Sequence, residues 1–279
     1  MKSGRPVLSP ITYPGNAELV KQVEHRPYPL PAGPWVMKQI WEDLLFAHWA
    51  IDPEVMRALV PPRLPLDLFE NQAYIAVVPF RMRGIRPRGL PAVPWLSNFA
   101  ELNVRTYVTL NGKPGVYFFS LDAANPVGVW LGRNWFHLPY QNARMACEPI
   151  APAFAPRTIP GDQAKTWIRY YNHRTHRGSP AAEFIADYGP TGPVYHARRG
   201  TLEHWLTERY CLYALDQRGQ VYRGEIHHAP WPLQPAAAQL AVNTMLTGHA
   251  LTTPPVPPLL HFARCIDVVV WPPQRIAAG

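Results

Sequence analysis

Proline is the residue that most restricts how this chain can fold. It accounts for 34 of the 279 residues, or about 12%, where about 5% is usual. Because proline lacks a backbone N–H and clashes with the preceding helical turn, it interrupts long helices. The sequence therefore excludes a helical bundle or a coiled coil as the main architecture. It favours many strands joined by turns that contain proline.

The balance of apolar and charged residues indicates a folded domain. Hydrophobic residues make up 47% of the chain and charged residues 16%, which supplies a core and is too little charge for a disordered polypeptide. No internal repeat and no dividing linker is visible. We therefore expect one domain over residues 35–279, preceded by a proline-rich arm at 1–34 that can wrap it.

The sequence favours a cytoplasmic protein without a membrane partner. No apolar run approaches the roughly 18 residues that a membrane span needs, and no apolar signal segment follows Met1. The three cysteines, at 147, 211 and 265, are widely spaced and include no CxxC pair. This pattern predicts neither a disulfide framework nor a thiolate metal site.

Arginine supplies most of the net charge of +8, with 22 arginines against 5 lysines. Its planar, permanently charged group binds carboxylates and phosphates, so an anionic small-molecule ligand is an alternative to a plain basic surface. The cluster from Arg81 to Arg88 is interrupted by Pro87 and followed by Gly89, and we predict a mobile loop there. It lacks aromatic residues for base stacking and a helical framework, so no nucleic-acid partner is expected.

Alternation and turn residues predict a chain rich in strands. Residues 101–110 alternate as a strand, and Asn111-Gly112 is a strong hairpin turn because both residues tolerate positive φ. Residues 115–121 form the returning strand. Further strands are predicted at 73–80, 141–150, 165–173, 181–188, 210–216, 220–227 and 260–271.

Three short helices carry start signals. Asp52 precedes one, Asn125 precedes a second and Thr201 caps a third. The second helix has apolar residues at helical spacing up to Pro139, namely Val127, Trp130, Leu131, Trp135 and Leu138. The segment 36–51 fits a helical period in its first part and a buried strand in its second, and both alternatives stay open.

Polar residues on one face of the 101–110 strand are the first candidates for chemistry. Glu101, Asn103 and Arg105 share a face, about 7 Å apart per step, and Leu102 and Val104 point the other way. On an outer face the polar residues are merely solvated. On an inner face they would converge on one cavity, where they must satisfy each other or a ligand because burying unpaired charge is costly.

The histidines show no spacing typical of a metal site. His173 with His176, and the pair His227-His228, lack a carboxylate at a zinc-motif distance, and we predict surface or capping positions for them. His137 ends the second helix, where it either complements the helix dipole or faces a cavity. No phosphate-binding glycine loop and no nucleophile elbow is present, so neither metal nor cofactor is expected.

Four stretches carry a family resemblance: FAHWAIDPEVMRALVPPRLPLD (46–67), ELNVRTYV (101–108), GVYFFSLDAANP (115–126) and LTERYCLYALD (206–216). They resemble the YqjF-like bacterial proteins, a family of unknown function, and the likeness covers about residues 36 to 272. That family is similar to a distant branch of the acetoacetate decarboxylase-like superfamily. The resemblance implies a single-domain, mainly β fold: a closed, mostly antiparallel barrel with a few short helices and one cavity.

The resemblance also shows where this chain departs from the decarboxylases. They carry a Gly-Arg dipeptide, a short apolar turn and then Pro-Lys-Lys, and the frame from Gly132 to Gln141 matches this pattern except that Tyr140 and Gln141 replace the lysines. A Schiff-base decarboxylase needs an amine whose pKa is lowered, so that mechanism is not expected here. Glu101 falls where the decarboxylases place an active-site glutamate, which favours an inward position.

From the resemblance we expect an enzyme that acts without a Schiff base on a small carboxylate or oxo compound. Glu101 would be the general acid or base, tuned by burial against Arg105, and Tyr140 would donate to a developing oxyanion. The expected substrate-binding residues are Arg105, which would clamp the anion, with Asn103, His137 and Gln141. Candidates for apolar walls are Trp130, Trp135 and Phe119, although core packing would explain them equally well.

The alternative is a protein without catalysis that carries or senses a hydrophobic acid, because the barrel has lost its nucleophile. Either function implies a small, anionic ligand. A homo-oligomer is a further expectation, since related barrels assemble into oligomers.

Overall fold

The computed structural model describes residues 16–151 and 167–276, where twelve strands form one continuous sheet. The strands are β1 (Met37–Ile51), β2 (Ala73–Pro87), β3 (Phe99–Leu110), β4 (Lys113–Ala123), β5 (Tyr140–Ile150), β6 (Trp167–Arg174), β7 (Glu183–Pro190), β8 (Cys211–Leu215), β9 (Val221–His227), β10 (Leu233–Asn243), β11 (Leu259–Val270) and β12 (Gln274–Arg275). The helices are α1 (Asn16–Leu19), α2 (Pro53–Leu59), α3 (Pro94–Ser97), α4 (Pro126–Trp135) and α5 (Leu202–Thr207), with a 3₁₀ turn η2 (Thr247–His249). No helix in these ranges is long and apolar enough to cross a membrane.

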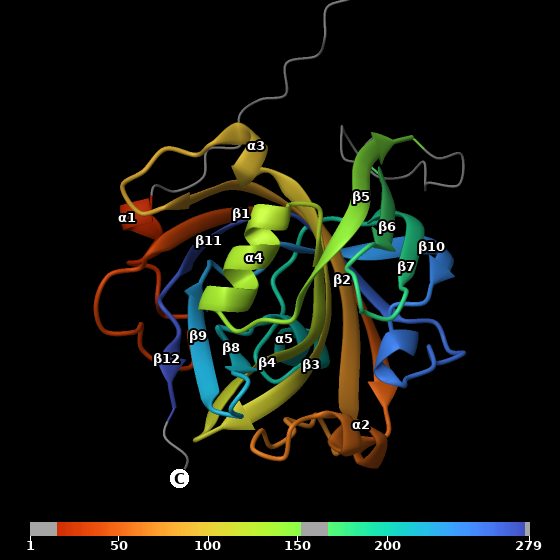
Figure 1. Ribbon diagram of the computed structural model, residues 1–279, viewed down its shortest axis with the longest axis horizontal. Helices are drawn as coiled ribbons and strands as arrows, with labels where there is room; N and C mark the ends of the chain where they lie inside the picture. Colours follow the sequence, from red (N-terminus) through yellow and green to blue (C-terminus); the bar gives the residue numbers. More distant parts are fainter. Residues whose placement is uncertain (1–15, 152–166, 277–279) are drawn as a thin grey trace, which may run out of the picture.

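The sheet closes on itself into a barrel. Nine strands follow one another in the order β4-β3-β2-β1-β11-β10-β7-β6-β5, and β5 pairs with β4 to close the ring. The β4–β5 and β4–β8 pairs are parallel, and the other pairs are antiparallel. The expected closed, mostly antiparallel barrel with few helices is confirmed. Helices α2 and α3 lie at opposite ends of it (Figure 1).

Five strands of this barrel also belong to a second closed ring. Strands β8 and β9 connect β4 to β11, so that β4, β3, β2, β1 and β11 form a shared wall with a core on each face. On one face Leu102 belongs to a core with Tyr170 and Phe184. On the opposite face Phe80 belongs to a core with Trp231. Every β3 residue from 100 to 108 is therefore buried, whichever face it points to.

Local turn and capping chemistry forms the elements that the sequence predicts most directly. Asn111 and Gly112 both have positive φ, 53° and 70°, in the β3–β4 hairpin, as the predicted turn requires. The side chains of Asp52, Asn125 and Thr201 each accept a hydrogen bond from a backbone N–H in the first turn of α2, α4 and α5. These predictions are confirmed.

Pairing with strands that are distant in the sequence determines the structure of two other segments. The segment 36–51 is strand β1 and not a helix. The prediction of a mobile loop at Arg81–Arg88 is wrong, because β2 continues to Pro87. Gly84 bends this strand with a φ of 61°, and Arg83 pairs with Glu42 on β1 at 2.7 Å. The arginines of β2 thus lie in a strand that is fixed by its pairing with β1, about forty residues earlier in the sequence.

A strand without a sequence signal was missed. Residues of β10 read LQPAAAQLAVN and include a proline and a run of alanines, which carry little strand preference. Its pairing with β7 and β11 supplies the order that the local sequence does not.

The N-terminal segment packs on the shared wall through Leu19. Leu19 is buried together with Val269 and Trp271, and the Nε2 atom of His227 lies 2.9 Å from the Leu19 carbonyl oxygen. The predicted surface or capping position of His227 and His228 is therefore wrong, since both are fully buried and neither caps a helix of the described residues. Residues 1–15 of the predicted arm lie outside the described residues.

A buried ion pair ties two sides of the nine-strand ring together. Arg174 of β6 donates to the carboxylate of Asp122 of β4, with 2.7 Å between Nη2 and Oδ1. The two side chains are 2% and 0% exposed. Asn172 donates to the same carboxylate at 3.0 Å, so this buried charge is well satisfied.

Candidate functional site

Glu101 lies at the centre of a small buried polar group on the shared wall. The residue is only 1% exposed. The Tyr140 hydroxyl donates to Oε2 at 3.0 Å, and the Asn103 side chain also hydrogen-bonds the carboxylate. No ion pair to Glu101 occurs among the described residues. The structure therefore brings three of the predicted site residues together: Glu101, Asn103 and Tyr140.

Burial dominates the protonation of this group. Desolvation raises the pKa of Glu101 from its ordinary 4.5 to about 8, and the hydrogen bonds from Tyr140 and Asn103 only partly oppose it. Desolvation, together with the nearby Glu101, also holds the pKa of Tyr140 well above its usual value. Glu101 is thus mainly a neutral acid at pH 7, able to donate a proton and then to remain as a hydrogen-bonded carboxylate.

Helix α4 and strand β5 fix the position of Tyr140. The Tyr140 ring lies directly on Gly132 of α4, where an added Cβ would come within 2.2 Å of a ring carbon. Arg133 donates to the Tyr140 carbonyl oxygen at 2.8 Å. Tyr140 also pairs with Leu121 of β4 in the parallel ladder. Gly132 and Arg133 therefore both contact Tyr140 and fix its position.

Arg105 is buried on the same wall but does not contact Glu101. The residue is 8% exposed, and its guanidinium carbon lies 5.3 Å from the centre of the Phe46 ring and 5.9 Å from that of Tyr107. Its Nε and Nη2 atoms have no hydrogen-bond partner. The expected tuning of Glu101 by Arg105 is therefore wrong: desolvation and not a neighbouring cation sets the Glu101 pKa.

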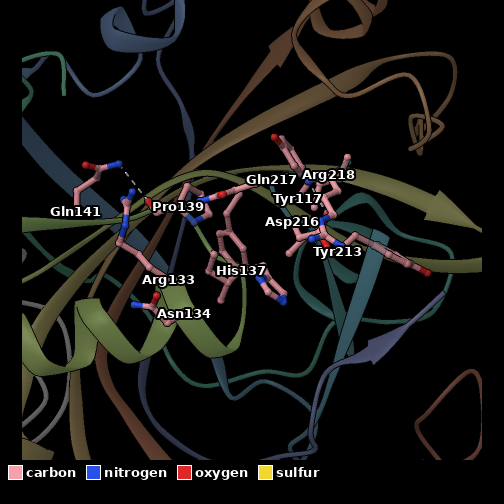
Figure 2. Close-up of a pocket in the computed structure, with 14 residues that line it drawn as sticks. Tyr117, Arg133, Asn134, His137, Pro139, Gln141, Tyr213, Asp216, Gln217 and Arg218 are labelled. Atoms are coloured by element: carbon pink, nitrogen blue, oxygen red, sulfur yellow. Dashed lines mark hydrogen bonds between the residues drawn. The ribbon is translucent and has the colours of Figure 1, made fainter. Parts of the chain in front are cut away.

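The remaining predicted residues line a separate surface pocket of about 680 Å³. Figure 2 shows Arg133, Asn134 and His137 on one side and the turn residues Asp216 to Arg218 on the other, with Gln141 at the edge. His137 has a φ of 54°, and its ring lies 4.4 Å from that of Tyr222. His137 and Gln141 therefore belong to this pocket and not to the buried group around Glu101.

The predicted apolar walls are mostly elsewhere. Trp130 and Trp135 are 62% and 58% exposed on α4, because the buried face of this helix is formed by Val129 and Gly132. Phe119 is partly buried and packs near His249. The helix was predicted from its apolar spacing, but most of that apolar stripe faces outward.

The lysines of the described ranges are engaged elsewhere. Lys38 pairs with Asp267 at 2.8 Å, Lys113 with Glu225 at 2.9 Å, and Lys21 with Glu18 at 3.4 Å. Lys2 and Lys165 lie outside the described residues. Over 16–151 and 167–276, no group of three or more histidine, cysteine, aspartate or glutamate side chains is arranged to hold a metal ion.

Sequence reasoning missed His48, which lies near Arg105, and His261, whose ring lies 6.4 Å from that of His48. His48 is 1% exposed and His261 is 8% exposed, and both lie on the shared wall. The available signal was the single polar residue in the apolar run LLFAHWAI of β1. A lone histidine in such a run must be neutral and hydrogen-bonded to remain buried.

Comparisons with known proteins agree with this fold. A family described as "uncharacterized conserved protein", DUF2071, matches residues 38–267. The chain is 42% identical over 257 residues to the uncharacterized protein YqjF of Bacillus subtilis, which covers 92% of this chain and 99% of that protein.

Two solved structures are similar at low sequence identity. The enduracididine biosynthesis enzyme MppR complexed with pyruvate has a TM-score of 0.58 at 12% identity, covering 90% of this chain and 94% of that one. An acetoacetate decarboxylase-like enzyme from Sphingomonas wittichii has a TM-score of 0.56 at 13% identity, covering 91% and 98%. These likenesses establish the acetoacetate decarboxylase-like fold that the sequence resemblance implies.

The protonation of Glu101 predicts how stability varies with pH. The folded state keeps this proton up to about pH 8, whereas an unfolded chain loses it near 4.5. The folded state therefore binds more protons in this window, and the free energy of unfolding falls as pH rises, by on the order of 4 kcal/mol. Denaturant unfolding between pH 5 and 9 should show this slope in the wild type and a flatter one in Glu101→Gln. The exposed-site control Glu148→Gln should keep the wild-type slope, and equal slopes in all three proteins would contradict the assignment.

The contact between Gly132 and Tyr140 predicts a second effect. Gly132→Ala places a methyl group inside the Tyr140 ring, so we expect a loss of about 1–3 kcal/mol of stability from overpacking and a further rise of the Glu101 pKa as the hydrogen bond weakens. In the matched control Gly128→Ala, on the same helix, the new Cβ comes no closer than 3.2 Å to another atom, at the outer end of the Phe99 ring. Unfolding curves that shift equally for both variants would show that Tyr140 is not held in this way.

Proposed function

This chain belongs to the DUF2071 family of uncharacterized conserved proteins, and we propose that it is an enzyme that acts on a small carboxylate or oxo compound by general acid catalysis. The observation that carries the proposal is the buried Glu101 with its pKa raised to about 8. Strongly perturbed acids of this kind are concentrated at functional sites. Such a group donates a proton at neutral pH, which an ordinary glutamate cannot do.

The neighbours of Glu101 suit this role. Once the proton has moved to a developing oxyanion or carbanion of the substrate, Glu101 becomes a carboxylate. The Tyr140 hydroxyl and the Asn103 amide then stabilise that charge, since hydrogen bonds to an ionised acceptor are stronger. Tyr140 thus acts on the catalytic group while Glu101 meets the substrate.

The proposed reaction does not pass through a Schiff base. Tyr140 and Gln141 offer no amine, and the described lysines 21, 38 and 113 are held by carboxylates. An acid–base reaction on a carboxylate or oxo compound needs no amine nucleophile. The pyruvate of the MppR complex supports a small carboxylate as the ligand, and we assign the Arg105 guanidinium to its anionic end.

A second candidate function is a binding protein for a small acid. It is favoured by the buried Arg105, whose Nε and Nη2 atoms have no acceptor and could hold a carboxylate tightly without further chemistry. This alternative requires a bound ligand that is released unchanged.

The two functions are separated by incubating the protein with small oxo and hydroxy acids and following the mixtures by NMR. We expect conversion of at least one compound by the wild type and a loss of about 100-fold or more in Glu101→Gln, with affinity for that compound retained. The control Glu148→Gln should convert it at the wild-type rate. Unchanged turnover in Glu101→Gln would overturn the role of Glu101, and tight binding without product would favour the binding protein.

A further inference from the structure

Arg105 and His48 are neighbours on one face of the shared wall, on either side of Ala76. Both are cross-strand partners of Ala76, Arg105 from β3 on one side and His48 from β1 on the other. Paired residues of neighbouring strands point to the same face, and only the Ala76 methyl group separates the two longer side chains. The polar atoms of Arg105 and His48 therefore lie near one another in the buried part of the shared wall.

Arg105 supplies buried hydrogen-bond donors that have no acceptor. Arg105 hydrogen-bonds the Tyr107 hydroxyl, but its Nε and Nη2 atoms are buried and have no partner. A guanidinium keeps its charge even when buried. The Nε and Nη2 hydrogens point in parallel and match the two oxygens of a carboxylate.

His48 supplies a buried hydrogen-bond acceptor, Nδ1, that has no donor. The Tyr107 hydroxyl donates its single hydrogen to the Leu206 carbonyl oxygen at 2.8 Å, so it must accept from the Nε2 of His48, 2.7 Å away. The proton of His48 is therefore on Nε2, and its Nδ1 carries a lone pair. Nδ1 is buried and has no partner. Burial of the ring, together with the nearby Arg105 charge, holds the pKa of His48 well below its usual value, so Nδ1 remains unprotonated.

Aromatic side chains surround Arg105 and His48. The Phe46 ring lies 5.8 Å from the His48 ring, measured between centres, and the Tyr107 ring lies 6.1 Å from it. The ring of His261 lies 6.4 Å from His48 and also has an unpartnered Nδ1. The unpartnered polar atoms of Arg105 and His48 thus lie among aromatic rings.

We propose that Arg105 and His48 form the binding site for a small hydroxy acid, whose carboxylate accepts from Nε and Nη2 of Arg105 and whose hydroxyl donates to Nδ1 of His48. The proposal deepens the proposed function by naming its substrate class, and it rests on that function only for the claim that the bound acid is then converted. A neutral His48 discriminates among small acids, because an acid without a hydroxyl leaves Nδ1 buried and unpaired.

Calorimetric titration with matched acids tests this discrimination. We expect glycolate to bind at least about tenfold more tightly than acetate, and lactate at least about tenfold more tightly than propionate or pyruvate, since only the hydroxy acids pair Nδ1. Equal affinities within these sets, or no binding of any of the acids, would overturn the proposal. The second result would mean that the unpaired atoms are satisfied by water alone.

Two variants assign the two ends of the ligand. Arg105→Met should lose at least about tenfold in affinity for all of the acids, and His48→Phe should erase the difference between glycolate and acetate. The controls Arg169→Met and His173→Phe change exposed residues of β6 and should bind as the wild type does. Discrimination that persists in a folded His48→Phe protein would overturn the assignment of the hydroxyl to Nδ1.

A measurement on the unaltered protein covers the case in which a buried variant fails to fold. In ¹⁵N NMR of labelled wild type, the His48 Nδ1 resonance should shift on addition of glycolate and stay in place with acetate. Failure of the proposed function is distinguishable from failure of this site. If Glu101→Gln binds and converts glycolate like the wild type, only the role proposed for Glu101 is overturned. A His48 resonance that does not shift with glycolate overturns the hydroxy-acid site.

Discussion

Burial of both faces of the shared wall governs the chemistry of this protein. Because β3 takes part in two closed rings, its residues from 100 to 108 have no solvent on either side. Glu101 and Arg105 are both buried on this wall but differ in their chemistry. A carboxyl group can bind a proton and become neutral, whereas a guanidinium cannot lose its charge. The wall thus holds a neutral acid near the start of β3 and, in the middle of the same strand, a cation that needs an anion.

The sequence predicts those parts of the fold that depend on neighbouring residues. The β3–β4 hairpin and the starts of α2, α4 and α5 were predicted because a turn or a cap is local chemistry. The strand at Arg81–Pro87 and the burial of His227 were not, because their partners, Glu42 and Leu19, lie far away in the sequence. Alternation along β3 showed which residues share a face, but it could not show that both faces are buried.

The candidate residues occupy three places, although the sequence suggested one cavity. Glu101, Asn103 and Tyr140 form a buried group, Arg105 lies beside His48, and His137 and Gln141 line a surface pocket. Neither Tyr140 nor Gln141 carries an amine, so these two residues cannot form a Schiff base. A tyrosine against a neutral glutamate supports proton donation, and the seat that Gly132 provides for its ring keeps the two groups in contact.

The central claim is that Glu101 is a neutral acid at pH 7, and infrared difference spectroscopy tests it most directly. The spectrum of the wild type minus that of Glu101→Gln isolates the carboxyl group of this one residue. The account predicts the carbonyl stretch of a protonated carboxylic acid at pH 7, lost with a midpoint near pH 8. A spectrum with only the bands of a carboxylate at pH 7 would contradict it.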